Sequence, residues 1–197
     1  MKLRLAMFCV ALTTPSLAKA DFVLHLPIGA KTTYSELETT IPNTVPVGPF
    51  INGAFPTATA PKSIHRTVWV INGPQPITEV YAGITAQLKR TGYEKILSCV
   101  SRECGGYDFR FAIDVVDEPM MRVDLRDYHF ITAKQAVADS PTYVTFLLSK
   151  SPLSLYLQIT EYRPANNPSK IMAEFSIVLE GLTFEAGSVA IGADPND

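Results

Sequence analysis

The sequence is poor in the residues that usually build catalytic or metal sites. Its three histidines, His25, His65 and His129, stand apart, without His-x-x-x-His or His-Glu-x-x-His spacing. It contains no Gly-x-Ser-x-Gly elbow, no phosphate-binding loop and no Gly-x-Gly-x-x-Gly fingerprint. A catalytic or ligand site needs convergent partners, so we expect no catalytic residue, no cofactor site and no metal site.

Long apolar runs are also lacking. No continuous apolar segment reaches the ~20 residues that a helix needs to span a bilayer. At the N-terminus two basic residues precede a short apolar stretch, residues 5–12, and Ala18-Lys19-Ala20 has the small-x-small pattern of a signal peptidase site. We therefore expect residues 1–20 to be a cleaved export signal and the mature chain to begin at Asp21. A buried N-terminal helix or an uncleaved anchor is the alternative.

Positive charge is in short supply. Removal of the signal takes Lys2, Arg4 and Lys19 from the 17 basic residues and leaves 14 against 19 acidic ones, a net charge of −5. Such a chain has no electrostatic attraction to nucleic acid or to anionic lipid. The ~177 residues that remain suit one domain with appendages.

Cysteine is scarce as well, and only Cys99 and Cys104 follow the expected signal. In an oxidising compartment a close pair most simply forms a disulfide. The spacing is not that of a Cys-x-x-Cys redox centre, and no second pair completes a zinc site, so these roles are the weaker alternatives. Closing so short a loop stabilises a protein by roughly 2 kcal/mol or less, so we expect the disulfide mainly to hold local shape.

Proline divides the chain into an extended lead and a regular domain. Residues 21–62 are rich in proline and threonine, with only short apolar pieces. Proline at this density excludes long helices, so we expect a lead that wraps over the rest and has no core of its own. The regular pattern occupies residues 63–165. Residues 166–197 are expected to be a linker and the truncated start of a further domain.

The regular region predicts an α+β fold. Ile77, Tyr81, Ile84 and Leu88 form one apolar stripe, which predicts a helix over residues 77–91 that ends at Gly92. The expected strands are HRTVWVI, KILSCV, FRFAIDVV, MMRVDL, DYHFITAK, TYVTFLLS and LSLYLQITEY. Their period of two indicates one face against a core. We predict an antiparallel sheet of about five to seven strands with one main helix on a face, in a ferredoxin-like or related split arrangement.

Acidic residues cluster in two places, and a pair of carboxylates can cleave a glycan. Asp114, Asp117 and Glu118 form one group, while Asp124 and Asp127 flank Arg126. Because these acids alternate with arginines on the predicted wet side of strands, we interpret them as solvated ion pairs with Arg122 and Arg126.

Aromatic residues of the later strands suggest a second kind of site. An open sheet face lined by them could bind peptide or glycan, but we favour a division between core and scattered surface positions. The residues concerned are Tyr128, Phe130, Tyr143, Tyr156 and Tyr162.

Several blocks together resemble the N-terminal periplasmic domain of OmpA-family envelope proteins of alphaproteobacteria. The most specific block is C-x4-C-G-G-x-D-F-R-F, from Cys99 to Phe111, and the similarity covers about 100 residues. The other matching features are PVGPFINGAFPT, Trp69, Gly92-Tyr93, Val123-Asp124-Leu125 and Tyr128-His129-Phe130. The resemblance implies an envelope location and no known enzymatic activity.

The tail has a resemblance of its own. VLEGLTFEAGSVAIG is similar to the first strand and loop of the OmpA-like peptidoglycan-binding domain, whose later ligand-holding residues have no counterpart here. We expect a non-catalytic envelope protein with an ancestral role in linking outer membrane and peptidoglycan, and with peptidoglycan or another envelope protein as partner. The alternative is a free periplasmic binding or regulatory domain that acts through its sheet surface or edge.

Overall fold

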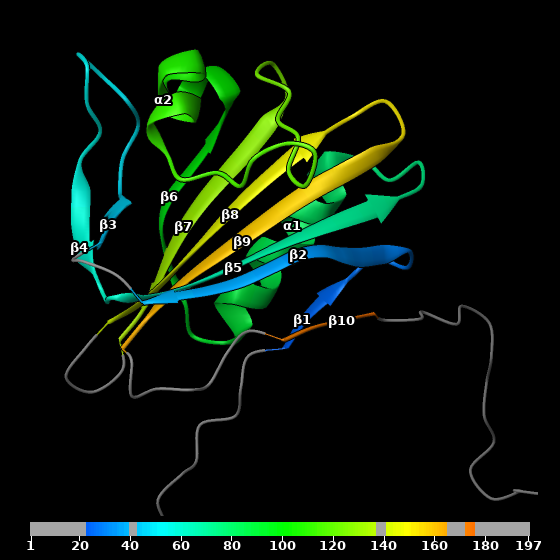
Figure 1. Cartoon of the computed structure of the whole chain (residues 1–197), viewed down its shortest axis with the longest axis horizontal. Helices are drawn as coiled ribbons and strands as arrows, with labels where there is room; N and C mark the ends of the chain where they lie inside the picture. The colour runs from blue at the N-terminus through cyan, green and yellow to red at the C-terminus, as the bar shows by residue number, and fades with distance from the viewer. Residues whose placement is uncertain (1–22, 40–42, 137–140, 165–171, 176–197) are drawn as a thin grey trace, which may run out of the picture.

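The computed structural model describes residues 23–39, 43–136, 141–164 and 172–175, so the expected signal peptide and most of the expected linker and tail lie outside the described residues. Its centre is a six-stranded antiparallel sheet with the order β2-β5-β9-β8-β7-β6 (Figure 1). This confirms the predicted α+β class with one main sheet. The strands are β2 (Ala30–Thr39), β5 (Ser63–Asn72), β6 (Glu94–Val100), β7 (Tyr128–Gln135), β8 (Thr142–Lys150) and β9 (Ser154–Arg163).

Helix α1 (Ile77–Arg90) lies on one side of the sheet, which we call the helical face. Its buried residues include Ile77, Ile84 and Leu88 of the predicted stripe, whereas Tyr81 is only partly buried. The helix ends as predicted, because Gly92 takes a positive φ of 77° and the N–H of Tyr93 donates to the Leu88 carbonyl at 3.0 Å.

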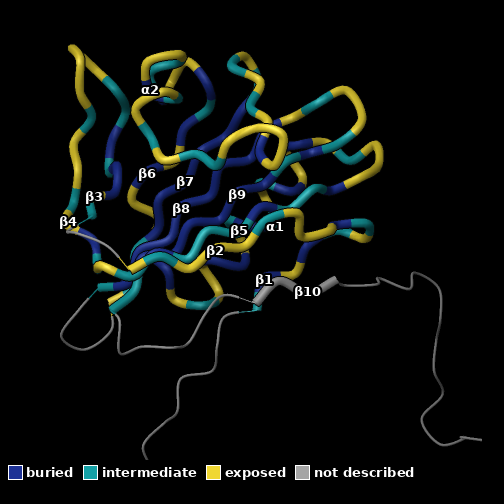
Figure 2. The backbone as a smooth tube through the Cα atoms, viewed as in Figure 1, coloured by how far each residue is buried: buried dark blue, intermediate teal, exposed yellow. Residues whose placement is uncertain are grey.

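Irregular segments cover the opposite side, which we call the loop face. One is the lead around β3 (Asn43–Pro46) and β4 (Thr57–Ala60), and the other is residues 101–127. The central strands are therefore buried on both faces, as Figure 2 shows, and every residue from Thr142 to Ser149 of β8 is buried. A strand enclosed in this way carries near-continuous apolar sequence, as TYVTFLLS does.

Two predicted strands are wrong. The first half of FRFAIDVV, together with the three residues before it, forms helix α2 (Gly106–Ala112). MMRVDL forms turns and irregular chain. Phe109 is fully buried, but Phe111 is 63% exposed, so the alternation of phenylalanines did not mark a sheet face. The loop face of the sheet needs a cover, and burial of Phe109 against it outweighs local strand propensity.

The lead is more than the wrapping segment that we expected. β2 is an edge strand of the main sheet and pairs with β5 along its length. Arg66 of β5 anchors it, because Arg66 Nη1 lies 2.7 Å from Glu38 Oε2 of β2. Arg66 Nε also lies 2.6 Å from Oδ2 of Asp114, in the segment that follows residues 106–112. β1 (Val23–Leu26) places Leu24 and Leu26 in the core of the helical face.

The end of the described chain returns to its beginning. β10 (Met172–Phe175) pairs with β1 in parallel, with Val23 opposite Met172 and Leu26 opposite Phe175. Figure 1 shows this two-stranded sheet beside α1 and apart from the six-stranded sheet. The start of the tail thus has a partner inside this chain.

Candidate functional site at the disulfide-bonded end of the sheet

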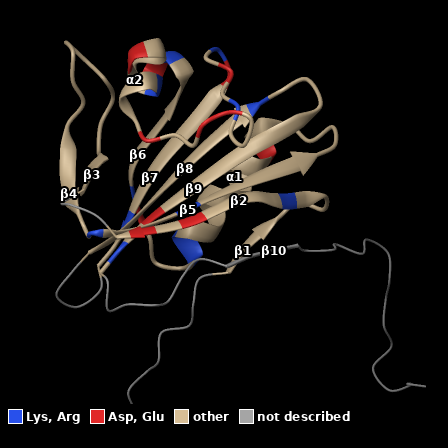
Figure 3. Ribbon diagram, in the orientation of Figure 1, with Lys and Arg blue, Asp and Glu red and all other residues tan. Residues whose placement is uncertain are grey.

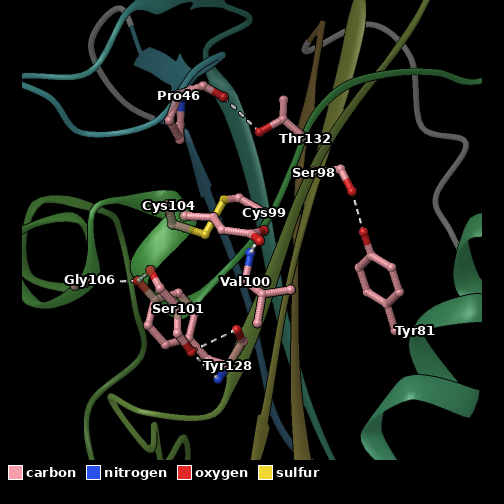
Figure 4. Close-up of a disulfide and its surroundings, with 11 residues drawn as sticks. Pro46, Tyr81, Ser98, Cys99, Val100, Ser101, Cys104, Gly106, Tyr128 and Thr132 are labelled. Carbon is pink, nitrogen blue, oxygen red and sulfur yellow. Dashed lines mark hydrogen bonds between the residues drawn. A yellow bond between two sulfur atoms is a disulfide. The ribbon is translucent and has the colours of Figure 1, made fainter.

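The two cysteines lie where β6 ends. Their sulfur atoms are at disulfide distance, 2.07 Å, and they close the turn formed by η1 (Ser101–Cys104) (Figure 4). Gly105 follows with a φ of 116°, and a side chain there would meet Phe50, whose N–H donates to the Cys104 carbonyl at 2.7 Å. Only glycine fits both constraints. The disulfide therefore locks a turn onto which the lead is packed.

Tyr128 joins this turn to the sheet. Its hydroxyl donates to the carbonyls of Ser101 and Gly106, at 3.1 and 2.8 Å, and its N–H donates to Ser101 Oγ at 3.1 Å. Burial raises the pKa of Tyr128 to about 12, while Arg110 nearby acts to lower it. The start of β7, the 3-10 turn and the start of α2 are thus tied to one side chain (Figure 4).

Other buried polar residues of the sheet hold the covering segments by their backbones. Thr132 Oγ1 donates to the Pro46 carbonyl at 2.7 Å. Gln158 accepts from the Val116 N–H at 2.8 Å and donates to the Asp114 carbonyl at 3.1 Å. Buried polar groups cost free energy unless they are paired. These contacts therefore hold the covering segments in one position over the sheet.

Exposed aromatic side chains project from α2. Tyr107 and Phe111 are 62% and 63% exposed, and their ring centroids lie 4.6 Å apart. The guanidinium of Arg110 lies 5.5 Å from the Phe111 ring centroid. Exposed apolar rings on a short helix favour an interaction surface.

A hollow of about 390 Å³ opens beside η1. Its lining contains two arginines, one glutamate, one serine and two aliphatic residues: Val100, Ser101, Arg102, Glu103, Leu125 and Arg126. Figure 3 shows acidic and basic residues side by side over α2 and the loop that follows it. The hollow and the aromatic pair form the candidate binding surface of this end.

The acidic residues do not form the ion pairs that we predicted. Neither Arg122 nor Arg126 pairs with an acid among the residues that the structure covers, whereas Asp114 pairs with Arg66. Asp124 accepts from the Arg126 N–H at 2.9 Å, which closes a turn. The acids therefore stabilise loops or stay solvated, and the two arginines are left available.

Most of the aromatic residues considered for an open sheet face are in the core. Tyr128, Phe130, Tyr143 and Tyr162 are at most 5% exposed, and Tyr156 is partly buried. The sheet has no open aromatic face in the described chain, because covering segments lie on both sides.

The three histidines lie on three different strands, β1, β5 and β7. His25 is exposed on β1, and His129 of β7 packs its ring 4.7 Å from that of Tyr81. Burial lowers the pKa of His129, although Asp127 and Glu103 act in the opposite direction. His65 belongs to a polar chain that was not predicted from the sequence.

In that chain, Ser35 Oγ lies 3.1 Å from His65 Nε2, and His65 Nδ1 lies 3.5 Å from Glu161 Oε1. This is the order of a serine nucleophile, base and acid. However, Ser35 is exposed on the edge strand, and Glu161 Oε2 binds Arg163 at 2.6 Å, which neutralises the carboxylate. We interpret the chain as a link between β2, β5 and β9. Only the strand register brings these residues together, so no sequence signal could have found it.

Within the described residues, no group of three or more His, Cys, Asp or Glu side chains is arranged to hold a metal ion. No helix in that part of the chain is both long and apolar enough to cross a bilayer. Neither protein-family models nor curated protein sequences give a match to this chain.

Proposed function

We propose that this chain is a non-catalytic cell-envelope protein of the OmpA-family type, exported to the periplasm and associated with the outer membrane. Its ancestral role is to link that membrane to peptidoglycan, and its partner is peptidoglycan or another envelope protein. The disulfide supports an oxidising compartment, because such bonds persist outside the cytosol.

The main support is that blocks of the OmpA-family resemblance, far apart in the sequence, meet at one end of the sheet. Phe55 of the lead lies 5.6 Å from Phe109 of α2, measured between ring centroids, and Phe109 lies 5.0 Å from Phe130 of β7. Phe50 binds the Cys104 carbonyl. Residues that match a family by separate short blocks are more informative when they build one structural unit than when they scatter over the surface.

Fractionation and wall binding test this proposal. The chain with its N-terminus intact is expressed in a Gram-negative host, and the mature protein is expected in the envelope fraction with Asp21 as its first residue. A variant that lacks residues 1–20 is the control and should stay inside the cell. Recovery of both forms from the same compartment would overturn the export step.

Purified mature protein is then mixed with insoluble peptidoglycan. Retention in the pellet supports a wall-linking role, and a pellet without the protein favours the second candidate.

That candidate is a free periplasmic binding domain that acts through a sheet edge. β2 is an edge strand, most of its residues are exposed, and Leu37 is 70% exposed. Edge strands offer backbone groups to an added strand. Capture of an envelope protein that is lost on Leu37→Asp would support it over wall binding.

A further inference from the structure

The two arginines of the hollow have no acidic partner among the described residues. Arg102 and Arg126 are both exposed, and neither forms an ion pair there. Glu103, the one acid in the lining, is partly occupied, because its Oε2 accepts from the Val100 N–H at 3.3 Å. The hollow therefore has an excess of positive charge in a chain whose overall charge is negative.

The first turn of α2, which carries Tyr107, lies close to the hollow. The Tyr128 hydroxyl donates both to Ser101, which lines the hollow, and to Gly106, which precedes Tyr107. One phenol oxygen thus fixes the distance between the hollow and the first turn of α2. Tyr107 therefore follows directly after a residue that is held beside the lining of the hollow.

We propose that this surface binds a carboxylate-bearing peptide, with the carboxylate between Arg102 and Arg126 and an apolar side chain on Tyr107 and Phe111. Guanidinium groups match the planar geometry of a carboxylate and donate two hydrogen bonds to it. This inference rests on the proposed function, because it assumes that a partner binds at the disulfide-bonded end of the sheet.

The local charge selects a singly charged anion. Glu103 directly follows Arg102 and Asp127 directly follows Arg126, and both carboxylates repel phosphate or nucleic acid more strongly than one carboxylate. A neutral sugar would leave the arginines without a partner. The lining by Val100 and Leu125 adds apolar contact, which suits an amino-acid side chain.

The probe is N-acetyl-phenylalanine, titrated into the mature protein and followed by backbone amide chemical shifts. We expect the amides of Arg102, Arg126, Tyr107 and Phe111 to shift together. N-acetyl-phenylalaninamide, which lacks the charge, should bind about tenfold more weakly, because charge-assisted hydrogen bonds are lost. N-acetylmuramic acid, a carboxylate on a sugar, should also bind more weakly, since it has no apolar side chain for the rings.

The double variant Arg102→Gln/Arg126→Gln is expected to bind N-acetyl-phenylalanine about tenfold more weakly and to bind the amide as well as the wild type does. Phe111→Ala should weaken the binding of both compounds to the same extent. The matched control, Lys89→Gln/Arg90→Gln on the exposed end of α1, makes the same change of net charge and should alter neither.

The inference is overturned if the acid and the amide bind equally well, or if the control variant weakens the binding of the acid as much as the double variant does. It is also overturned if N-acetylmuramic acid binds more strongly than N-acetyl-phenylalanine. Wall retention is measured separately. If the double variant loses the probe while the wild type is still retained by peptidoglycan, the peptide assignment stands beside the proposed function. If the probe does not bind but wall retention persists, only this inference is lost.

Discussion

The side-chain amide of Gln87 pairs with the backbone of His25 as a neighbouring strand would. Its Oε1 accepts from the His25 N–H at 2.7 Å, and its Nε2 donates to the His25 carbonyl at 2.9 Å. Gln87 is buried on α1, although its neighbours in the stripe are apolar. A polar residue in the helix stripe thus holds β1 against the domain.

Replacing Gln87 with leucine should lower the free energy of unfolding by about 1–3 kcal/mol, because a partly buried N–H and a partly buried carbonyl lose their partners. Denaturant unfolding of the mature protein measures the change. Lys89→Leu, on the exposed side of the same helix, is the control and should stay within about 0.5 kcal/mol of the wild type. Equal effects of the two changes would contradict the role of Gln87.

Two truncations separate β10 from the residues that follow it. Ending the chain after residue 171 removes the partner of β1, whereas ending it after Phe175 keeps that partner. The shorter protein should therefore melt about 2–6 °C below the longer one, as expected for ~1–2 kcal/mol in a domain of this size. Identical melting curves for the two truncations would show that the β1–β10 pairing contributes nothing.

The disulfide should contribute about 2 kcal/mol, the value for closing so short a loop in the unfolded chain. Cys99→Ala/Cys104→Ala should therefore melt roughly 4–8 °C below the wild type. Reducing agent should bring the wild type to the same temperature and leave the double variant unaffected. A wild type that resists reducing agent while the double variant melts lower would assign the loss to core packing, since both residues are buried.

The stability of the domain should fall as the pH rises from about 10 toward 12. The pKa of Tyr128 is raised in the folded protein to about 12, above the ~10 of an unfolded tyrosine, so the unfolded chain loses the proton first. Burial raises the pKa of Tyr93 and Tyr162 as well, and both add to the loss.

Tyr128→Phe isolates this residue. The variant should be about 1–2 kcal/mol less stable at neutral pH, because two carbonyls lose their donor, and its alkaline loss should be smaller. Denaturant unfolding from neutral pH upward measures both effects. An unchanged alkaline slope would assign the loss to the other tyrosines.

A fluorophosphonate probe should not label Ser35, because this side chain is exposed on an edge strand and the Glu161 carboxylate beside His65 is held by Arg163. Mass spectrometry of the treated protein checks this, with a known serine hydrolase as the positive control. An adduct at Ser35 that disappears in His65→Gln would overturn the non-catalytic proposal.

The sequence predicted those elements whose signals are local. α1 has its stripe, its length and its Gly92 stop within one window, and β8 and β9 have apolar runs that only a buried strand tolerates. α2 could not be predicted in this way, because its seven residues carry the period of a strand and its position depends on the disulfide turn and on Phe130, which is distant in sequence.

The candidate site was predicted only in part. The Cys99–Cys104 spacing indicated a disulfide, and the resemblance drew attention to the block that ends at Phe111. The hollow between Arg102 and Arg126 depends on how residues 101–127 cross the sheet. The hydrogen bonds of Gln87 depend on how β1 packs against α1. Both are set by tertiary contacts that leave no periodic pattern.

The parallel pairing of β1 and β10 determines how the domain responds to force. The two strands run side by side in the same direction, so a pull on the chain before Val23 and after Phe175 slides one strand along the other. All the ladder hydrogen bonds then carry the load at once, in shear, instead of opening one by one as in a zipper. A domain tethered through both ends would thus load this small sheet first, and because Leu24 and Leu26 of β1 lie in the core, the same pull would have to draw them out of it.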